Sequence, residues 1–252
     1  MHRFYIAPEN WNPDALSLHS AEAHHARDVL RLKSGDKVVV FNGQGREITA
    51  EIVDVAKNEV RLRKLHVTET PPLRCRIALA QAIPKGKNMD LIVQKAVEIG
   101  AAEIFPLISE RTIVDLDPKE AAQKREKWQT IAIEAAKQCG QNWLPQVHEP
   151  QKLKSFFAVA PAFDFGLIGS LQPGAMHLKK ILADYAAEHG KTEDQVRPSS
   201  VLMLIGPEGD FTPAELALAR SHGCLPLTLG PIVLRVETAA IYCLSILSYE
   251  LF

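Results

Sequence analysis

The sequence predicts a protein of the α/β class, with a small N-terminal β domain followed by a larger domain built on a mostly parallel sheet. Apolar residues alternate at period two through much of the first 70 residues, whereas from Arg76 onward short apolar runs alternate with stretches of helical periodicity. Pro71-Pro72 stands between the two patterns, and proline both interrupts helices and restricts the residue before it. We therefore expect two domains, residues 1–72 and residues 73–252.

The N-terminal domain is expected to contain a β-hairpin, a further strand and one helix. Apolar residues alternate over residues 38–52 on both sides of Gly43-Gln44-Gly45, whose glycines supply the positive φ that a hairpin turn needs. Residues 58–67 alternate in the same way and predict another strand. Ser20 belongs to the residue types that cap helices, and it predicts a helix through Leu32.

The C-terminal domain contains five short apolar runs that predict buried strands. They cover residues 77–82, 103–108, 163–169, 201–206 and 225–230. Two of the helices expected between them have clear start and stop signals. One opens at Asp117-Pro118 and closes at Gly140, and the other opens with the capping box Thr212-Pro213-Ala214-Glu215 and closes at Gly223.

Composition places the chain among ordinary globular proteins. It has 252 residues, of which 46% are hydrophobic and 23% charged, and its formal net charge is −1. The predicted domains are both close to neutral, with 10 basic and 10 acidic side chains before residue 73 and 19 and 20 after it. Any contact with nucleic acid must therefore come from a local patch.

Cysteine usage and the N-terminus indicate a reducing environment. The four cysteines lie far apart without a CxxC pair, so the sequence suggests neither a disulfide framework nor a zinc site, and we expect no metal. The first residues lack the basic and apolar regions of a signal peptide, and no uncharged apolar run of about 18 residues occurs. We expect a soluble, cytoplasmic protein that does not enter a membrane.

Three predicted strands of the C-terminal domain end in glycine-containing loops, which are Leu167–Ser170, Ile205–Phe211 and Leu229–Pro231. In α/β sheets ligands bind beyond the carboxyl ends of strands, where glycine allows close backbone approach, so these loops predict one shared pocket. For each loop alone, ordinary turn chemistry remains the alternative. The motifs GxGxxG, GxxxxGK[ST], GxSxG and HExxH are absent, which argues against a dehydrogenase, a P-loop enzyme and two classes of hydrolase.

The sequence allows two interpretations for each of two groups of charged residues. Arg235 and Glu237, which lead into the last helix, form either part of a site or a plain ion pair. Arg27, Arg31 and Lys33 form either a local basic patch or a solvated helix face. The last helix itself has the spacing of a core or dimer contact at Ala240, Cys243, Leu244 and Leu247.

Six motifs give a resemblance that spans nearly the whole chain. In order they are MHRFYI, HHARDVLRLKSGDKV, KGKNMDLIVQKAVEIG, EAAKQCGQNWLP, IGPEGDF and LGPIVLRVETAA. The ordered set resembles the bacterial 16S ribosomal RNA uracil-N3 methyltransferases of the SPOUT superfamily. The resemblance implies an N-terminal PUA-like β-barrel that helps to hold RNA, and a C-terminal α/β domain whose end is tucked into a trefoil knot. From the residue patterns alone a knot would not be expected.

The same resemblance implies a role for the three glycine loops, which become the binding site of S-adenosylmethionine. The residues implied to bind this cofactor are Gly169, Ile205, Gly206, Pro207, Glu208, Gly209, Leu229, Gly230, Leu234, Thr238 and Ala239. The residues implied to contact RNA are Arg3, Arg27, Arg31, Lys33, Lys85, Lys87, Gln138 and Asn142. The implied partners are 16S ribosomal RNA or the small ribosomal subunit, and a second copy of the chain in a homodimer.

Methyl transfer to uracil N3 sets the roles expected of the charged residues. N3 is a poor nucleophile until it loses its proton, and that loss leaves negative charge on the flanking carbonyl oxygens. Arg235 stays protonated, so it can stabilise the anion but cannot act as the base. Glu237 is the expected catalytic carboxylate, with Glu208 as the other candidate for taking the proton. Because N3 lies within a Watson–Crick pair, the target base must be unpaired or flipped out.

The chain departs from the family pattern at three positions. Asp210 stands where the family usually has a second glycine, and Ile232 and Gln141 stand where it usually has arginine. These changes bear on specific RNA contacts more than on the cofactor pocket. Three alternatives remain: methylation of another RNA position or of a ribose oxygen, a non-catalytic RNA-binding protein, and an α/β enzyme acting on a small molecule.

Overall fold

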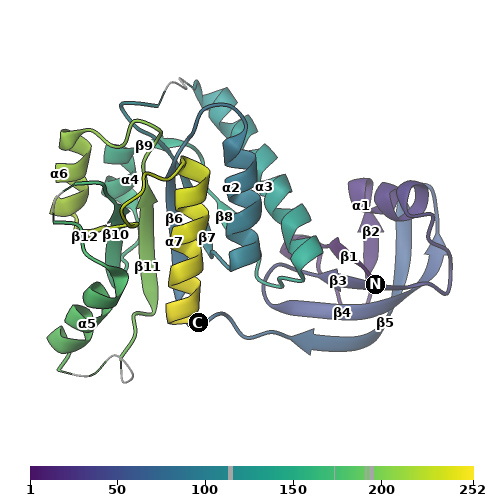
Figure 1. Cartoon of the computed structure of the whole chain (residues 1–252). Helices are drawn as coiled ribbons and strands as arrows, with labels where there is room; N and C mark the ends of the chain where they lie inside the picture. Colours follow the sequence, from purple (N-terminus) through teal and green to yellow (C-terminus); the bar gives the residue numbers. More distant parts are fainter. Residues whose placement is uncertain (113–115, 173, 191, 193–195) are drawn as a thin grey trace. The chain divides into compact units, whose positions relative to one another are not determined.

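The computed structural model describes residues 1–112, 116–172, 174–190, 192 and 196–252, and the chain divides into two compact units (Figure 1). The units are Met1–Pro72 with Ile133–Leu144, and Leu73–Ala132 with Pro145–Phe252. The sequence placed residues 133–144 in the larger domain, but in the structure they group with the N-terminal segment. Backbone hydrogen bonds explain this, because Gly45 N donates to Asn142 O at 2.9 Å and Leu144 N donates to Gly43 O at 3.0 Å.

The first unit contains a five-stranded sheet of order β1-β3-β4-β5-β2. Its elements are β1 (His2–Tyr5), the 3-10 helix η1 (Pro8–Asn10), β2 (Ser17–His19), α1 (Ser20–His24), the π-helical segment η2 (His25–Val29), β3 (Lys37–Phe41), β4 (Arg46–Val55) and β5 (Glu59–Glu69). β3 and β4 form the predicted hairpin, with Val38 opposite Ala50, and both turn glycines have positive φ. The alternating apolar residues face inward and form the core of the unit.

The predicted helix from Ser20 through Leu32 is wrong in its start and its end. His19 occupies the N-cap position without a side-chain hydrogen bond, and Ser20 has a φ of +50°. The α-helix continues as a π-helical segment that ends at Val29. Arg31 then takes a left-handed conformation with a φ of +55°, which a right-handed helix cannot continue through.

The second unit contains a seven-stranded sheet in which every pairing is parallel, as the apolar runs predicted. The order is β12-β10-β11-β6-β7-β8, with β9 also paired to β7. The strands are β6 (Arg76–Ala82), β7 (Glu103–Ile108), β8 (Gln146–Val147), β9 (Gln151–Lys152), β10 (Phe165–Gly169), β11 (Ser200–Ile205) and β12 (Cys224–Leu227). The helices are α2 (Asn88–Ile99), α3 (Pro118–Cys139, which continues into the first unit), α4 (Leu153–Val159), α5 (Leu178–Glu188), α6 (Pro213–Ser221) and α7 (Val236–Leu251).

Helices cover both faces of this sheet. α4 and α6 share one core with alternate strand residues such as Ala80 and Leu204. On the opposite face α7, drawn in yellow in Figure 1, packs against β6, β11 and α2. Since all the strands run in the same direction, the loops that follow them lie at one edge of the sheet. Among the described residues, no helix has both the length and the apolar character that a membrane crossing needs.

The predicted helix signals are present in the structure. Glu120 N donates to Asp117 Oδ1 at 2.8 Å at the start of α3. Thr212 and Glu215 form the predicted capping box at the start of α6. These caps satisfy N–H groups that have no partner within the helix, and so they fix where each helix begins.

Candidate functional site

A cavity of about 580 Å³ lies at the carboxyl edge of the second unit's sheet, and we call it the glycine-loop cavity. Its lining residues are Asn88, Gly169, Ser170, Leu171, Ile205–Asp210, Leu229 and Ile232–Glu237 together with Ala239. The three glycine loops that the sequence pointed to therefore surround one cavity. Its volume falls in the range of roughly 300–1,000 Å³ that is usual for small-molecule sites.

The loop after β11 forms a tight turn over Pro207–Asp210. Asp210 N donates to Pro207 O at 2.9 Å, and Asp210 takes a φ of +61°, in the left-handed region that favours glycine. Glu208 Oε1 accepts a hydrogen bond from the backbone N of Lys85 at 2.8 Å, which ties the turn to the loop after β6. The turn is thus held at a fixed position relative to the neighbouring strand.

Gly206, which precedes this turn, is packed tightly against it. A Cβ atom there would lie 3.2 Å from both Asp210 Oδ1 and Phe211 Cδ2, so a larger residue would press on the turn itself. Turn chemistry therefore accounts for this glycine.

The loops after β10 and β12 are joined to each other. Ser170 N donates to Leu227 O at 3.0 Å, so the end of β10 is held beside the end of β12. Gly230 has a φ of +101° and turns the chain after β12, and its N–H donates to Thr228 Oγ1 at 3.3 Å. These bonds bring residues 169–171 and 229–235 to the same side of the cavity.

The start of α7 adds two charged residues, Arg235 and Glu237, to the lining. Arg235 occupies the N-cap position, and its exposed guanidinium makes no hydrogen bond or ion pair with any residue that the structure describes. Glu237 is half-buried, and its Oε2 accepts a hydrogen bond from Asn88 Nδ2 at 3.2 Å. Within the described part of the chain these two residues form no ion pair with each other, so the plain ion-pair interpretation does not hold.

Most of the residues expected around a cofactor line this cavity, but two do not. Gly230 shapes its loop without reaching the lining, and Thr238 is exposed on α7 outside the lining. The sequence analysis missed Asn88, Leu171, Val233 and Val236, and it had named Ile232 only as a departure from a pattern. Ser170 and Asp210 belong to the predicted glycine loops, although neither had been named as a cofactor contact. Asn88 could have been found, because β6 neighbours β11 and its loop had to reach the same edge of the sheet.

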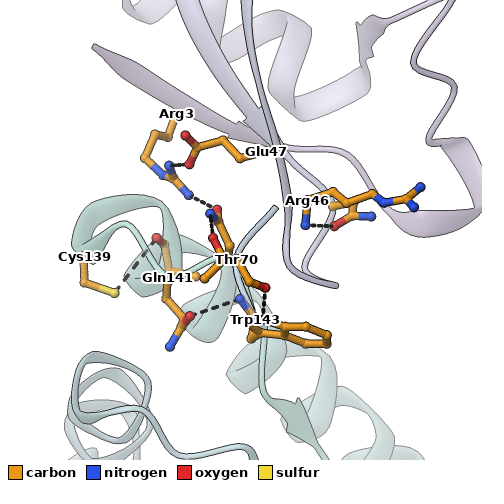
Figure 2. A network of polar contacts seen from close by, with 10 residues as sticks. Arg3, Arg46, Glu47, Thr70, Cys139, Gln141 and Trp143 are labelled. Carbon is orange, nitrogen blue, oxygen red and sulfur yellow. Dashed lines mark hydrogen bonds and ion pairs between the residues drawn. The ribbon is translucent and has the colours of Figure 1, made fainter. Parts of the chain in front are cut away.

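Some of the residues expected to contact RNA are already bonded to other residues of the fold. Arg3 and Asn142 belong to a network of polar contacts inside the first unit (Figure 2). Arg3 forms an ion pair with Glu47, and its Nη2 donates to Asn142 Oδ1 at 2.8 Å. Asn142 Nδ2 in turn donates to Thr70 Oγ1 at 2.9 Å, and Trp143 Nε1 donates to Thr70 O at 2.9 Å. Both side chains are therefore occupied in holding residues 142–143 against the strands.

The remaining candidates for RNA contact differ in whether their side chains are bonded to other residues. Arg27 is bonded to Asp28 and to the carbonyl of Lys57, and its guanidinium is the main cause of an Asp28 pKa lowered to about 2. The other five are exposed, and their side chains make no hydrogen bond or ion pair within the described ranges; these are Arg31, Lys33, Lys85, Lys87 and Gln138. Cations without an internal partner are available for phosphate.

No grouping that could bind a metal is evident in the described ranges, where no three His, Cys, Asp or Glu side chains gather suitably. The four cysteines are free thiols, and three of them are buried. Burial raises the pKa of Cys224 and of Cys243 to about 12, which keeps both thiols protonated at neutral pH.

Comparison with protein families gives two matches. Residues 71–248 match the RNA methyltransferase domain, and residues 19–65 match the RNA methyltransferase PUA domain. Together the two matches cover nearly all of the sequence. They confirm the predicted family and the PUA-like character of the N-terminal domain.

Individual relatives agree with these matches. Ribosomal RNA small subunit methyltransferase E of Bacillus subtilis is 31% identical over 235 residues, covering 93% of this chain and 90% of that protein. A methyltransferase from Legionella pneumophila, solved with bound S-adenosylmethionine, is 37% identical with a TM-score of 0.85, covering 98% of this chain and 96% of that one. The methyltransferase E of Neisseria gonorrhoeae, also bound to S-adenosylmethionine, is 30% identical with a TM-score of 0.82, covering 99% and 97%.

Proposed function

This chain belongs to the RNA methyltransferase family of the SPOUT superfamily, and on that premise we propose that it methylates N3 of one uridine in 16S ribosomal RNA. S-adenosylmethionine is the methyl donor. The observation that carries the proposal is the glycine-loop cavity, which brings an arginine without a partner among the described residues and a glutamate to the edge of a nucleoside-sized space. The trefoil knot remains an expectation from the family, and the division at residue 72 remains an expectation from the sequence pattern.

The residues around the cavity suit S-adenosylmethionine. Gly206 and Gly209 line the cavity with backbone and carry no side chain, and aliphatic side chains such as Ile205 and Leu234 offer apolar walls for a base. Glu208 and Glu237 supply negative charge, which suits the positive sulfonium and amino groups of this cofactor. When bound, S-adenosylmethionine supplies an electrophilic methyl group on sulfur.

Arg235 and Glu237 would then have different roles in activating the uracil. Arg235 has no partner among the described residues to compete for its guanidinium, so it is free to stabilise the oxyanion that forms as N3 loses its proton. Glu237 takes that proton, with Asn88 holding one carboxylate oxygen and leaving the other for the substrate. Glu208 is the weaker candidate, because its contact with Lys85 N serves to hold the turn.

Cations on both units would hold the RNA. Lys85 and Lys87 lie in the loop that precedes Asn88, close to the cavity, and their ammonium groups are exposed and unpaired within the described residues. They are therefore suited to phosphates next to the target nucleotide. Arg31 and Lys33 of the PUA-like domain would contact other phosphates, whereas Arg3 and Asn142 are assigned a structural role in that domain.

A homodimer completes the proposal. Ile232 and Val233 are each 72% exposed beside the cavity, and Tyr242 and Tyr249 are exposed seven residues apart on α7. Exposed apolar side chains of this kind are suited to being covered by another protein. A second copy of the chain is the occupant that the family suggests, and covering this surface would also shield the cavity from water.

Mapping the modified nucleosides of 16S ribosomal RNA tests the proposal. Cells that lack the gene should lose one N3-methyluridine, and the wild-type gene should restore it while the Arg235→Ala variant should not. Loss of a ribose methyl group or of another base modification would place the acceptor elsewhere. An unchanged map, together with no S-adenosylmethionine binding in equilibrium dialysis, would favour a non-catalytic RNA-binding protein.

A further inference from the structure

Arg111 contacts the wall of the glycine-loop cavity from outside. It follows β7, and its Nη1 donates a hydrogen bond to the carbonyl oxygen of Gly209, in the turn after β11. The aliphatic part of Arg111 also packs there, since a Cβ atom on Gly209 would lie 3.4 Å from Arg111 Cδ. Arg111 is not a lining residue, so it touches the turn and not the cavity.

Arg111 itself stands on a firmly held loop. Thr112 N donates to Ser109 O at 3.0 Å, and the hydroxyl groups of Ser109 and Thr112 lie 2.9 Å apart. Glu110 N donates to Oε1 of the buried Glu215 at 2.9 Å, which ties the loop to the first turn of α6. A long side chain on a loop held by these hydrogen bonds can help to keep a neighbouring loop in place.

The turn that Arg111 contacts needs such support. Asp210 adopts the left-handed conformation without being glycine, which is a less favourable backbone state. The turn is held from the loop after β6 by Lys85 N, which donates to Glu208, and from the loop after β7 by Arg111, which donates to the carbonyl of Gly209. Removing Arg111 leaves Gly209 O without this partner and removes the contact between the turn and the loop after β7.

We infer that Arg111 is a positioning residue that keeps the Pro207–Asp210 turn in the shape that the methyl donor requires. The inference rests on the proposed function, since it assumes that S-adenosylmethionine occupies the cavity. An exposed arginine in an RNA-modifying enzyme is also suited to contact phosphate. Its hydrogen bond to a carbonyl of the cavity wall favours the positioning role, and the two roles give different measurements.

The test compares Arg111→Ala and Arg111→Lys with the wild type by isothermal titration calorimetry with S-adenosylmethionine, and by turnover on 16S RNA. We expect Arg111→Ala to weaken cofactor binding about five- to tenfold, the loss typical of one intramolecular hydrogen bond at an exposed site. Arg111→Lys keeps a donor and should recover part of that loss. The KM for RNA and its dependence on salt should stay as in the wild type.

The matched control is Arg220→Ala. Arg220 is exposed on α6 in the same unit, and its side chain makes no contact of this kind within the described residues. This variant should bind S-adenosylmethionine like the wild type. The melting temperature of each variant without ligand shows whether the fold is intact, and Arg111→Lys replaces Arg111→Ala if the alanine variant does not fold.

Two results would overturn the inference. If Arg111→Ala binds S-adenosylmethionine as tightly as the wild type, Arg111 does not position the turn. If its cofactor affinity is unchanged while its KM for RNA rises and the salt dependence becomes shallower, Arg111 is a phosphate contact. Failure of the wild type itself to bind S-adenosylmethionine would overturn the proposed function as well, so the two failures are distinguishable.

Discussion

An arginine beside the glycine-loop cavity and an arginine in the polar network of the first unit differ in their exposure and in their partners. In the cavity, Arg235 is exposed and its guanidinium has no partner among the described residues. In the network, Arg3 is enclosed by Glu47 and Asn142, and its guanidinium also lies over the Phe41 ring at 4.8 Å (Figure 2). Both residues stand in motifs that resemble the family, so the sequence gives no hint of this difference.

The contrast shows how a charged residue of a family motif can be assigned to function or to folding. A buried or half-buried charge needs partners to offset the loss of water, and once it has them it is not free to bind a substrate. A charge beside a cavity that has no partner among the described residues makes no ion pair with them that stabilises the fold. We therefore propose that Arg235 serves the reaction and that Arg3 serves the fold.

The largest expected effect is that of Arg235→Ala on turnover. Removing a group that stabilises developing charge typically lowers the rate about 100- to 1,000-fold. Binding of S-adenosylmethionine should change by less than about twofold, because the interaction forms only as the uracil becomes an anion. Single-turnover kinetics and calorimetry separate the two quantities.

The control for Arg235→Ala is Arg3→Ala, which removes an arginine from the other region. Per folded molecule, this variant should keep its turnover within a few-fold of the wild type. Equal losses of turnover and cofactor affinity in Arg235→Ala would contradict its assignment to the transition state.

The second expected effect is that of Arg3→Ala on stability. Its side chain is 14% exposed and that of Glu47 is 20% exposed, so the substitution strands a largely buried carboxylate and an amide. We expect the free energy of unfolding to fall by roughly 2–4 kcal/mol. Urea denaturation followed by tryptophan fluorescence measures it, since Trp143 lies in the same network.

Arg63→Ala is the matched control, because Arg63 pairs with Glu51 on the same sheet but is 62% exposed. An exposed ion pair is worth at most about 1 kcal/mol, so this variant should be close to the wild type. Similar stabilities of the Arg3 and Arg63 variants would mean that the network of Figure 2 is not what holds residues 142–143.

The third effect concerns the unpaired lysines near the cavity. Replacing Lys85 and Lys87 by glutamine should weaken RNA binding and reduce the slope of log affinity against log salt by about one for each phosphate that a lysine no longer neutralises. Filter binding at several salt concentrations measures the slope. Lys180→Gln is the control, because Lys180 is already paired with Asp184 on α5. An unchanged slope in the double variant would remove these lysines from the RNA surface.

The smallest expected effect is that the ionisation of Glu103, at the start of β7, makes the stability of the fold depend on pH. A hydrogen bond from His148 lowers the pKa of Glu103 below its ordinary value of 4.5; burial opposes this shift, and the charge of Arg76 adds to it. Because the folded state binds the proton less readily than the unfolded state, the ionised carboxylate stabilises the fold above pH 4.5. This contribution is lost as the pH falls through the lowered pKa.

Urea denaturation from pH 7 to pH 3 checks this dependence in the wild type and in Glu103→Gln. The difference in their free energy of unfolding should be about 1 kcal/mol at neutral pH and should shrink on acidification. His148→Ala removes the main partner of the same carboxylate, and its difference from the wild type should shrink in parallel. A difference that stays constant down to pH 3 would show that the pairing of Glu103 contributes nothing.

The sequence by itself determined the local elements and the class of fold. Continuous apolar runs specify strands that are buried on both faces, and β6, β7 and β11 follow them closely. The caps at Asp117 and Thr212 are also local, since each side chain bonds to the backbone three residues away. The helix after Ser20 was mispredicted because π-helical hydrogen bonding and the left-handed Arg31 leave no clear trace in residue type.

Only the tertiary structure decided which polar side chains are free and which are already bonded. Asn88 and Glu237 are 149 positions apart, and Arg3 and Asn142 are 139 apart, so their contacts depend on how strands and helices are packed together. Spacing along the chain carries no information on such pairs. It is packing that leaves Arg235 unpaired beside the cavity, encloses Arg3, and places residues 133–144 with the N-terminal unit.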